Sequence, residues 1–235
     1  MDSLRKTALV AGALYLITFA TSIPALALYG SVRDPNYIVG PGPDTPVLFG
    51  GFLEMICALA CIGTAVVLFP VVKRQNEAVA LGFVGVRVLE ACIIVVGVVS
   101  LLAVVTLRQA GAGADALVTG QALVAFHDWT FLLGPGILPA VNALLLGSLL
   151  YQSRLVPRII PLVGLIGAPL LLASATATLF GLWGQVSALS AVFTIPIFLW
   201  ELSLGVWLVV KGFNASPITA GMVAAGTQDH RDVTV

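Results

Sequence analysis

The sequence predicts an all-α integral membrane protein, a helical bundle of six transmembrane helices. Hydrophobic residues make up 59% of the 235 residues and charged residues only 9%, whereas soluble domains carry about 25% charged residues. The mean hydropathy is +1.07, and the apolar runs are continuous rather than alternating, which favours helices over a β-barrel. The formal net charge is zero, so no basic field indicates nucleic acid as a partner.

Six segments are long and apolar enough to cross a lipid bilayer, which takes about 20 residues per helix. The expected spans cover residues 8–29, 47–72, 78–107, 121–151, 159–182 and 189–210. The third and fourth are long enough to tilt or to protrude. Residues 1–213 therefore form one membrane domain, and residues 214–235, which lack hydrophobic periodicity, are expected to be a disordered cytoplasmic tail.

Lysine and arginine alternate between the two sides of these spans, which predicts the orientation of the chain. One side carries Arg5, Lys6, Lys73, Arg74, Arg154, Arg158 and Lys211. The other side carries Arg33 and Arg108. The positive-inside rule then places both termini in the cytoplasm.

The first span has a second interpretation. Arg5 and Lys6, followed by an apolar run that ends in Ala25-Leu26-Ala27, are also typical of a secretory signal. The run extends to Tyr29, longer than an ordinary signal core, and five further spans follow. We therefore expect an uncleaved first helix.

The second and third spans contain the three cysteines and the first buried charges. Cys57 and Cys61 share one helix face and, with Cys92, are expected to be packing residues. Arg87 and Glu90 are the only ions in residues 78–107. At a spacing of three residues their side chains can meet on one helix face.

The fourth span combines adjacent polar residues with a predicted break. His127 and Asp128 should point about 100° apart on a helix, and we expect Asp128 to face the bundle and His127 the outer water. A helix break is expected at Gly134, Pro135, Gly136 and Pro139, because two prolines remove two amide donors. Broken helices line the sites of many transporters, although a simple kink is an equal alternative.

The last two spans contain small residues and prolines. Gly164, Gly167 and Ala168 would allow self-association, so a homo-oligomer or a partner membrane protein is an open expectation beside the lipid bilayer itself. Pro196 frees backbone groups just before Glu201.

Ionisable residues inside the spans are the candidate site, because a charge at the bilayer centre costs about 2.5–3.5 kcal/mol or more. They are Glu54, Arg87, Glu90, His127, Asp128 and Glu201. Helix rise places Glu54 and Asp128 about 10 Å from the outer ends of their helices. It places Arg87, Glu201 and Glu90 about 13–18 Å from the inner ends. Arg87 is expected to bridge Glu90 and Glu201.

The expected cluster holds more acids than bases. Four carboxyl groups share the interior with one guanidinium and one imidazole. This excess suits a proton or cation path, whereas a purely structural ion pair that joins helices is the simpler alternative.

No catalytic, metal or cofactor motif stands out. The sequence has no G-x-S-x-G, H-E-x-x-H, Walker loop or G-x-G-x-x-G, and a single histidine lies in a span. A zinc hydrolase and a bis-histidine haem are thereby disfavoured. We expect no metal and no cofactor, and we assign no catalytic residue.

Five segments are similar to one known family. They are SLRKTALVAGALYLITFATSIPALALYG, GVRVLEA, FHDWTFLLGPG, LVPRIIPLVGLIG and WELSLGVWLVVKGF, and with them residues 3–217 resemble the bacterial membrane-protein family described as domain of unknown function 4386. The resemblance implies a multi-pass protein of the bacterial inner membrane. It implies no activity, substrate or catalytic residue.

Three functions stay open. A small transporter or channel for protons, cations or a small solute ranks first, with the acidic cluster as its site. An accessory or sensor protein with a structural polar core ranks second. A membrane enzyme acting on a lipid or another apolar substrate ranks third, with His127 and Asp128 as acid and base. Its nucleophile could come only from hydroxyls available by position, those of Ser100, Ser148, Ser174 and Ser187.

Overall fold

The computed structural model describes residues 3–220 and is helical throughout, with no strand among these residues. Its long helices are α1 Ser3–Leu28, α2 Thr45–Val72, α3 Glu77–Gln109, α4 Leu117–Leu133, α5 Leu138–Ser153, α6 Ile159–Leu179 and α7 Ala188–Val210. Three short 3₁₀ helices are η1 Ser31–Arg33, η2 Ala114–Ala116 and η3 Pro217–Thr219. Six segments of the described chain are long and apolar enough to span a membrane, because α4 and α5 together form one broken span. The expected six-span membrane protein is confirmed.

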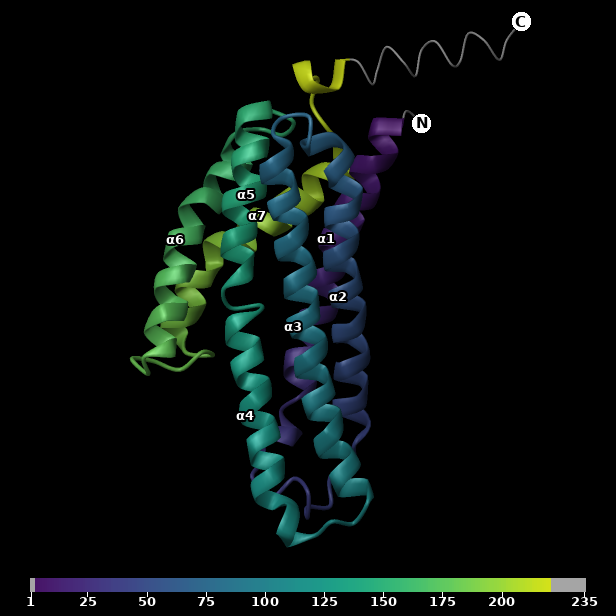
Figure 1. The fold of residues 1–235 in the computed structure, drawn as a ribbon, viewed down its shortest axis with the longest axis vertical. Coiled ribbons are helices and arrows are strands. Elements are labelled where there is room, and N and C mark those ends of the chain that lie inside the picture. The colour runs from purple at the N-terminus through teal and green to yellow at the C-terminus, as the bar shows by residue number, and fades with distance from the viewer. Residues whose placement is uncertain (1–2, 221–235) are drawn as a thin grey trace, which may run out of the picture.

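The helices form a ring in chain order, and α7 returns to pack against α1 (Figure 1). The loops after α2 and α5 lie at the same end as Ser3 and Ala220, an end we call the basic end after its lysines and arginines. The loops after α1 and α3 lie at the opposite end, the far end. The α6–α7 hairpin is shorter and forms a lobe beside the column of α1 to α4.

Close backbone contact closes the ring between α1 and α7. A methyl group at Gly12 would come within 2.7 Å of the Gly205 carbonyl oxygen and 2.8 Å of the Val209 nitrogen. Arg5 donates to the carbonyl oxygens of Leu208 at 2.8 Å and Val209 at 2.5 Å. These carbonyls belong to the last turn of α7, where a cation also favours the helix dipole.

The small residues of α6 serve packing inside this chain, which corrects their expected role in self-association. A methyl group at Gly164 would approach the Trp200 ring to 2.7 Å, and one at Gly167 would approach Pro196 to 2.8 Å. Ala168 is fully buried. This face of α6 is therefore covered by α7, as small residues in membrane helices allow.

The loop between α1 and α2 is held to the end of α3. Arg108 donates to Asp44 at 2.9 Å and to the carbonyl oxygen of Gly40 at 2.8 Å, and its guanidinium lies over the Tyr37 ring. Burial and the hydrogen bond to Asp44 raise the pKa of Tyr37 to about 12. Burial opposes ionisation of Asp44, but hydrogen bonds from Gln109 and Tyr37 and the charge of Arg108 lower its pKa overall.

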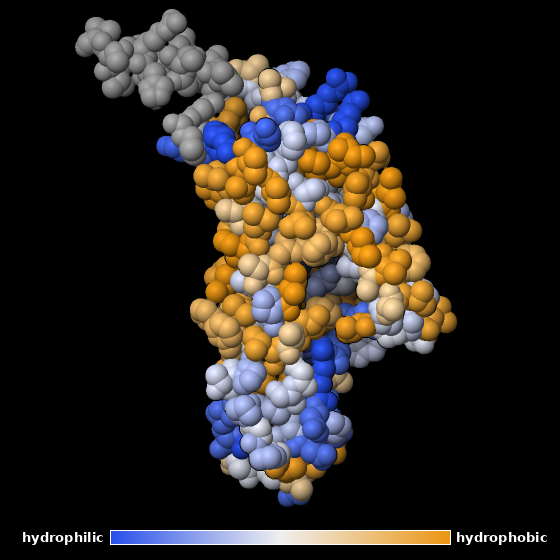
Figure 2. All heavy atoms as spheres, turned by 180° about the vertical axis from the view of Figure 1, so that it is seen from behind, coloured by the Kyte–Doolittle hydropathy of each residue, from blue (hydrophilic) through white to orange (hydrophobic). Residues whose placement is uncertain are grey.

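Hydrophobic side chains cover most of one face of the molecule, from near the basic end to about the level of the α6–α7 loop (Figure 2). Hydrophilic residues dominate below that level, at the far end. The far ends of α3 and α4 thus extend beyond the hydrophobic belt. A bilayer fitted to the belt would leave these ends in water.

Most boundaries differ from the expected ones by a few residues, and the structure explains two of the differences. Helix α6 ends at Leu179, and Gly181 follows with a φ of 74°, a left-handed conformation that glycine adopts without strain. After α7, the Ser216 hydroxyl donates to the Ser153 carbonyl oxygen at 2.6 Å, so the ordered chain continues past residue 213, where the membrane domain was expected to end. The rest of the expected disordered tail, residues 221–235, lies outside the described residues.

Candidate functional site

A buried ion cluster joins α3 to α7 in the middle of the bundle. Arg87 donates through Nη1 to Oε2 of Glu90 at 3.0 Å and through Nη2 to Oε1 of Glu201 at 2.6 Å. The first pair uses the i, i+3 spacing on α3. The Arg87 and Glu90 side chains are 3% and 5% exposed, and that of Glu201 is 13% exposed. Glu201 is therefore the acid with the freest access from outside the cluster.

Two uncharged residues complete the cluster. They were missed in the sequence because only acidic, basic and histidine side chains inside the spans were considered. Asn142 of α5 donates to Oε2 of Glu90 at 2.8 Å. The Tyr15 ring of α1 lies under the Arg87 guanidinium at 5.2 Å, within the range of a cation–π contact. Asn142 is the single asparagine inside an expected span, and that isolation was the available sequence signal.

The fourth span is interrupted between α4 and α5, at residues 134–137. Gly134 and Gly136 donate to the carbonyl oxygens of Thr130 and Phe131, which ends α4. A methyl group at Gly134 would meet Ile93 at 2.7 Å, so the interruption packs tightly against α3. Pro135 and Pro139 both line the cavity described next.

A central cavity of about 240 Å³ reaches the ion cluster. The acidic and basic side chains in its lining are Glu54, Arg87, Glu90 and Glu201. Its remaining wall is mainly apolar and includes Phe19, Ile94, Phe131 and Phe198. Figure 2 shows a hollow between the α1–α4 column and the α6–α7 lobe, with hydrophilic residues inside it.

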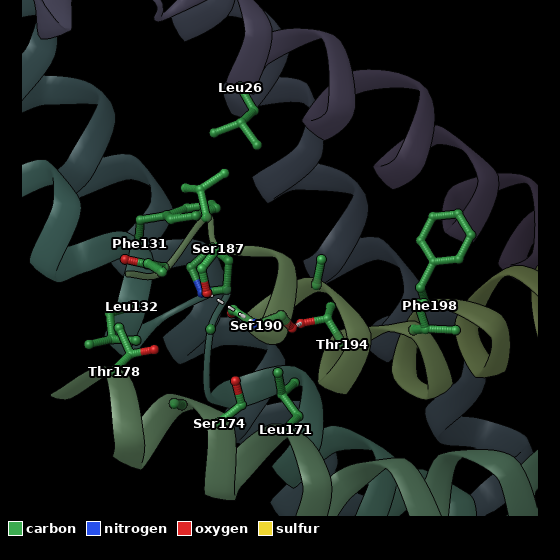
Figure 3. Close-up of a pocket in the computed structure, with 17 residues that line it drawn as sticks. Leu26, Phe131, Leu132, Leu171, Ser174, Thr178, Ser187, Ser190, Thr194 and Phe198 are labelled. Atoms are coloured by element: carbon green, nitrogen blue, oxygen red, sulfur yellow. Dashed lines mark hydrogen bonds between the residues drawn. The ribbon is translucent and has the colours of Figure 1, made fainter. Parts of the chain in front are cut away.

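A second cavity, the hairpin cavity, has a volume of about 320 Å³ and lies toward the loop of the α6–α7 hairpin (Figure 3). It shares six lining residues with the central cavity, so the two are continuous. These are Leu26, Phe131, Pro135, Leu171, Thr194 and Phe198. No ionisable side chain lines the hairpin cavity.

Several polar atoms of the hairpin cavity have no partner. The hydroxyls of Ser174 and Thr178 and the amide nitrogen of Gln185 are buried without a hydrogen bond. Serine and threonine in membrane helices usually bond to a carbonyl of their own helix, as Thr194 does with Ser190 at 2.8 Å. Buried unpaired hydroxyls cost free energy, so these groups are available to hydrogen-bond a molecule that enters the cavity.

The remaining acids lie nearer the far end, where one expectation was wrong. The Tyr29 hydroxyl donates to Oε2 of Glu54 at 2.8 Å. His127 is buried, with a side chain 4% exposed, whereas the Asp128 side chain is 49% exposed and 3.4 Å from Arg33. We expected the opposite arrangement, with Asp128 facing the bundle and His127 facing the outer water. Helix α4 turns His127 toward the end of α1, where its ring contacts that of Tyr29 edge to face.

The charge count changes accordingly. Asp128 does not belong to the buried acids, because its carboxylate is exposed and pairs with Arg33. Three carboxyl groups remain around the central cavity, those of Glu54, Glu90 and Glu201, and Arg87 contacts two of them. Glu54 accepts a hydrogen bond from Tyr29 and has no salt bridge in the described chain. The cavity lining thus contains three carboxyl groups and one guanidinium, where four carboxyl groups were expected in the interior.

The arrangement offers little for metal binding or nucleophilic catalysis. Among residues 3–220, no three His, Cys, Asp or Glu side chains gather as a metal ion would require. Ser100 and Ser148 donate to carbonyl oxygens of their own helices at 2.7 Å and 2.8 Å, and Ser187 caps α7. None of these serines is hydrogen-bonded to His127.

Comparison with known proteins supplies a family without a function. The family model of a domain of unknown function (DUF4386) matches residues 10–212. The chain belongs to the DUF4386 family. No curated protein and no solved structure matches it. The DUF4386 match covers five of the six candidate spans completely and the first from residue 10 onward, and it includes the ion cluster and both cavities.

Proposed function

We propose that this DUF4386 protein is a small transporter that moves an uncharged solute and couples its movement to protons. The observation that carries the proposal is the contact between the Arg87–Glu90–Glu201 cluster and a cavity large enough for a ligand. Buried ionisable residues in membrane helices commonly mark ion pathways. A binding cavity beside them gives a solute direct access to the groups that would carry the proton.

The geometry of Arg87 supports proton uptake without stranding a buried charge. The guanidinium pairs with two carboxylates at once, at 3.0 Å and 2.6 Å. If one carboxylate takes up a proton, the other still neutralises Arg87. Glu201 suits this role, because it also faces the central cavity and its side chain is the more exposed of the two.

The hairpin cavity supports an uncharged, largely apolar solute with one or two polar groups. Its lining has no ionisable side chain, and its unpaired Ser174, Thr178 and Gln185 groups would hydrogen-bond such a solute. Pockets of about 300 Å³ with apolar walls and few polar groups are typical of small-molecule sites.

The proposal includes an orientation of the protein in the membrane. The basic end would face the cytoplasm under the positive-inside rule, and the far end would face outward. The family resemblance favours the bacterial inner membrane as the location. In this orientation the hairpin cavity lies toward the outer leaflet.

Flux measurements in liposomes test the proposal. Purified protein is reconstituted with a pH-sensitive dye inside, and proton movement is followed after an outside pH step, with and without a panel of neutral amphipathic solutes. We expect solute-dependent proton flux for the native protein and none for Glu201→Gln. Glu77→Gln is the matched control, because Glu77 is exposed in the first turn of α3. Native protein without flux under every solute would overturn the proposal.

A second candidate is an accessory protein with a structural polar core. It is favoured because the charged groups of the ion cluster are paired with one another. Glu90 accepts from both Arg87 and Asn142, and Arg87 pairs with two acids. Such networks join helices in membranes. Co-purification of one fixed membrane partner, together with absent flux, would favour this function over transport.

A further inference from the structure

A line of polar residues connects the far-end surface to the central cavity. It starts at a far-end pocket of about 240 Å³ that is lined by Arg33 and Asp128. Oδ1 of Asp128 lies 3.4 Å from Nδ1 of His127, and the half-exposed Asp128 side chain contrasts with the buried ring. His127 therefore joins a water-accessible carboxylate to the protein interior.

A small void continues the line beyond His127. Its volume is about 10 Å³, and its polar lining residues are Glu54, His127 and Thr130. The rest of the lining is Gly97 and the apolar residues Ile94, Phe131 and Pro135. A space of about 10–15 Å³ with polar neighbours is sufficient for one water molecule. Glu54 also lines the central cavity, so the void lies between His127 and the ion-cluster cavity.

The orientation of the imidazole fits a relay. Nδ1 faces Asp128, while the Cδ2 atom at the other edge of the ring lies 3.3 Å from where a methyl group of Gly97 would stand. Cδ2 is bonded to Nε2, and both His127 and Gly97 line the void. A methyl group at Gly97 would also approach the Thr130 hydroxyl to 2.6 Å, so glycine keeps this space open.

We propose that Asp128, His127 and one water in the void form the proton entry route from the far end to Glu54. The inference rests on the proposed proton coupling. A proton on Asp128 passes to Nδ1 of His127, and the ring releases its Nε2 proton to the water. The water passes one of its own protons to the Glu54 carboxylate and is restored. The ring then keeps its proton on Nδ1; in each later cycle it rotates about the Cβ–Cγ bond, accepts the next proton from Asp128 at Nε2, and rotates back to release that proton to the water.

The electrostatic surroundings suit this role. An imidazole is the side chain that exchanges protons near neutral pH. Of the described residues, the ionisable groups facing His127 are Asp128 on its own helix, Tyr29 at the end of α1, Glu54 on α2 and Arg33 of η1. Helix α3 presents Gly97 and no ionisable group to it.

The opposite end of the bundle offers no comparable route. Between the ion cluster and the basic end, the interior is filled by fully buried apolar side chains such as Leu68, Phe83, Leu146 and Leu204. The central cavity and the pocket at the basic end share no lining residue. Apolar packing thus separates the ion cluster from the basic end in this conformation.

Chemical rescue tests the route. In the liposome assay, His127→Ala should slow proton flux at least about tenfold, and added imidazole should restore it by occupying the space of the ring. Asp115→Asn is the matched control, because it removes an exposed far-end carboxylate away from the route. Native flux in His127→Ala would overturn the route while leaving the transport proposal intact.

Two further measurements keep the test decisive. Gly97→Ala retains His127 but fills the void, so it should slow flux without rescue by imidazole; unchanged flux would overturn the role of the water. If the native protein shows no flux, the infrared carboxyl band that is lost in Glu54→Gln is followed after a pH jump. Slower protonation of Glu54 in His127→Ala would support the route without transport, and equal rates would overturn it.

Discussion

The Arg87 guanidinium lies 2.6 Å from the Glu201 carboxylate, although 114 positions separate the two residues in the chain. This contact joins α3 to α7 across the centre of the ring. It depends on the close approach of α7 to α1, since α7 reaches the cluster only by returning to the start of the chain. The ion pair and the closure of the ring are therefore one structural feature.

Arg87→Leu should destabilise the protein more than Glu54→Gln does. Loss of Arg87 leaves two buried carboxylates without a counter-charge, which costs about 3–5 kcal/mol. Glu54→Gln can keep the hydrogen bond from Tyr29 and should cost about 1 kcal/mol. Melting in detergent measures both, and comparable melting temperatures would contradict the central role of Arg87.

Ser174→Ala should leave stability unchanged or raise it by about 1 kcal/mol, because it removes a buried hydroxyl that has no partner. Solute-dependent flux should fall in the same variant, since the hydroxyl lines the hairpin cavity. Thr176→Val serves as control, because Thr176 is exposed and already bonded to the Leu172 carbonyl oxygen. A marked loss of stability in Ser174→Ala would indicate a hidden structural partner instead.

Gly12→Val should separate α1 from α7 and cost about 1–3 kcal/mol. The added side chain meets backbone atoms of α7, which cannot rotate away. Gly85→Ala is the comparison, because nothing lies within 4 Å of the added methyl group and alanine favours a helix. Urea or thermal unfolding in detergent distinguishes them, and equal effects would argue against close α1–α7 packing.

Asp44→Asn should remove part of the acid sensitivity of the far end. The folded pKa of Asp44 is lowered, so its stabilising effect is present above its ordinary pKa and is lost as pH falls through the folded pKa. The native protein should therefore lose more stability than the variant between about pH 7 and pH 3. Melting of both proteins at the two pH values gives the difference. Equal losses would show that Arg108 is not held through this carboxylate.

The spans could be predicted from the sequence because lipid imposes one strong rule, an apolar helix of about 20 residues. Arg87 and Glu90 could be paired because helical spacing fixes their distance. The contact between Glu201 and Arg87 was expected because a buried acid needs a base nearby. That requirement identifies the two partners but does not give their geometry.

Other parts of the site depended on packing that a single sequence does not encode locally. The facing of His127 and Asp128 is set by the rotation of α4 after a flexible loop, and a rotation of about 100° exchanges them. Tyr29 stands at the end of the first expected span, and its position in the sequence does not reveal its hydrogen bond to Glu54. The cavities arise because α6 and α7 lean away from the column, and no residue pattern states that angle.

The unequal helix lengths have a consequence for membrane thickness. Helix α3, with 33 residues, is about 50 Å long, whereas α6, with 21 residues, is about 32 Å long. A thin bilayer would leave the tip of the α6–α7 hairpin and the adjacent hollow among headgroups. A thicker one would submerge both in acyl chains, so the lipids themselves would regulate which molecules reach Glu201.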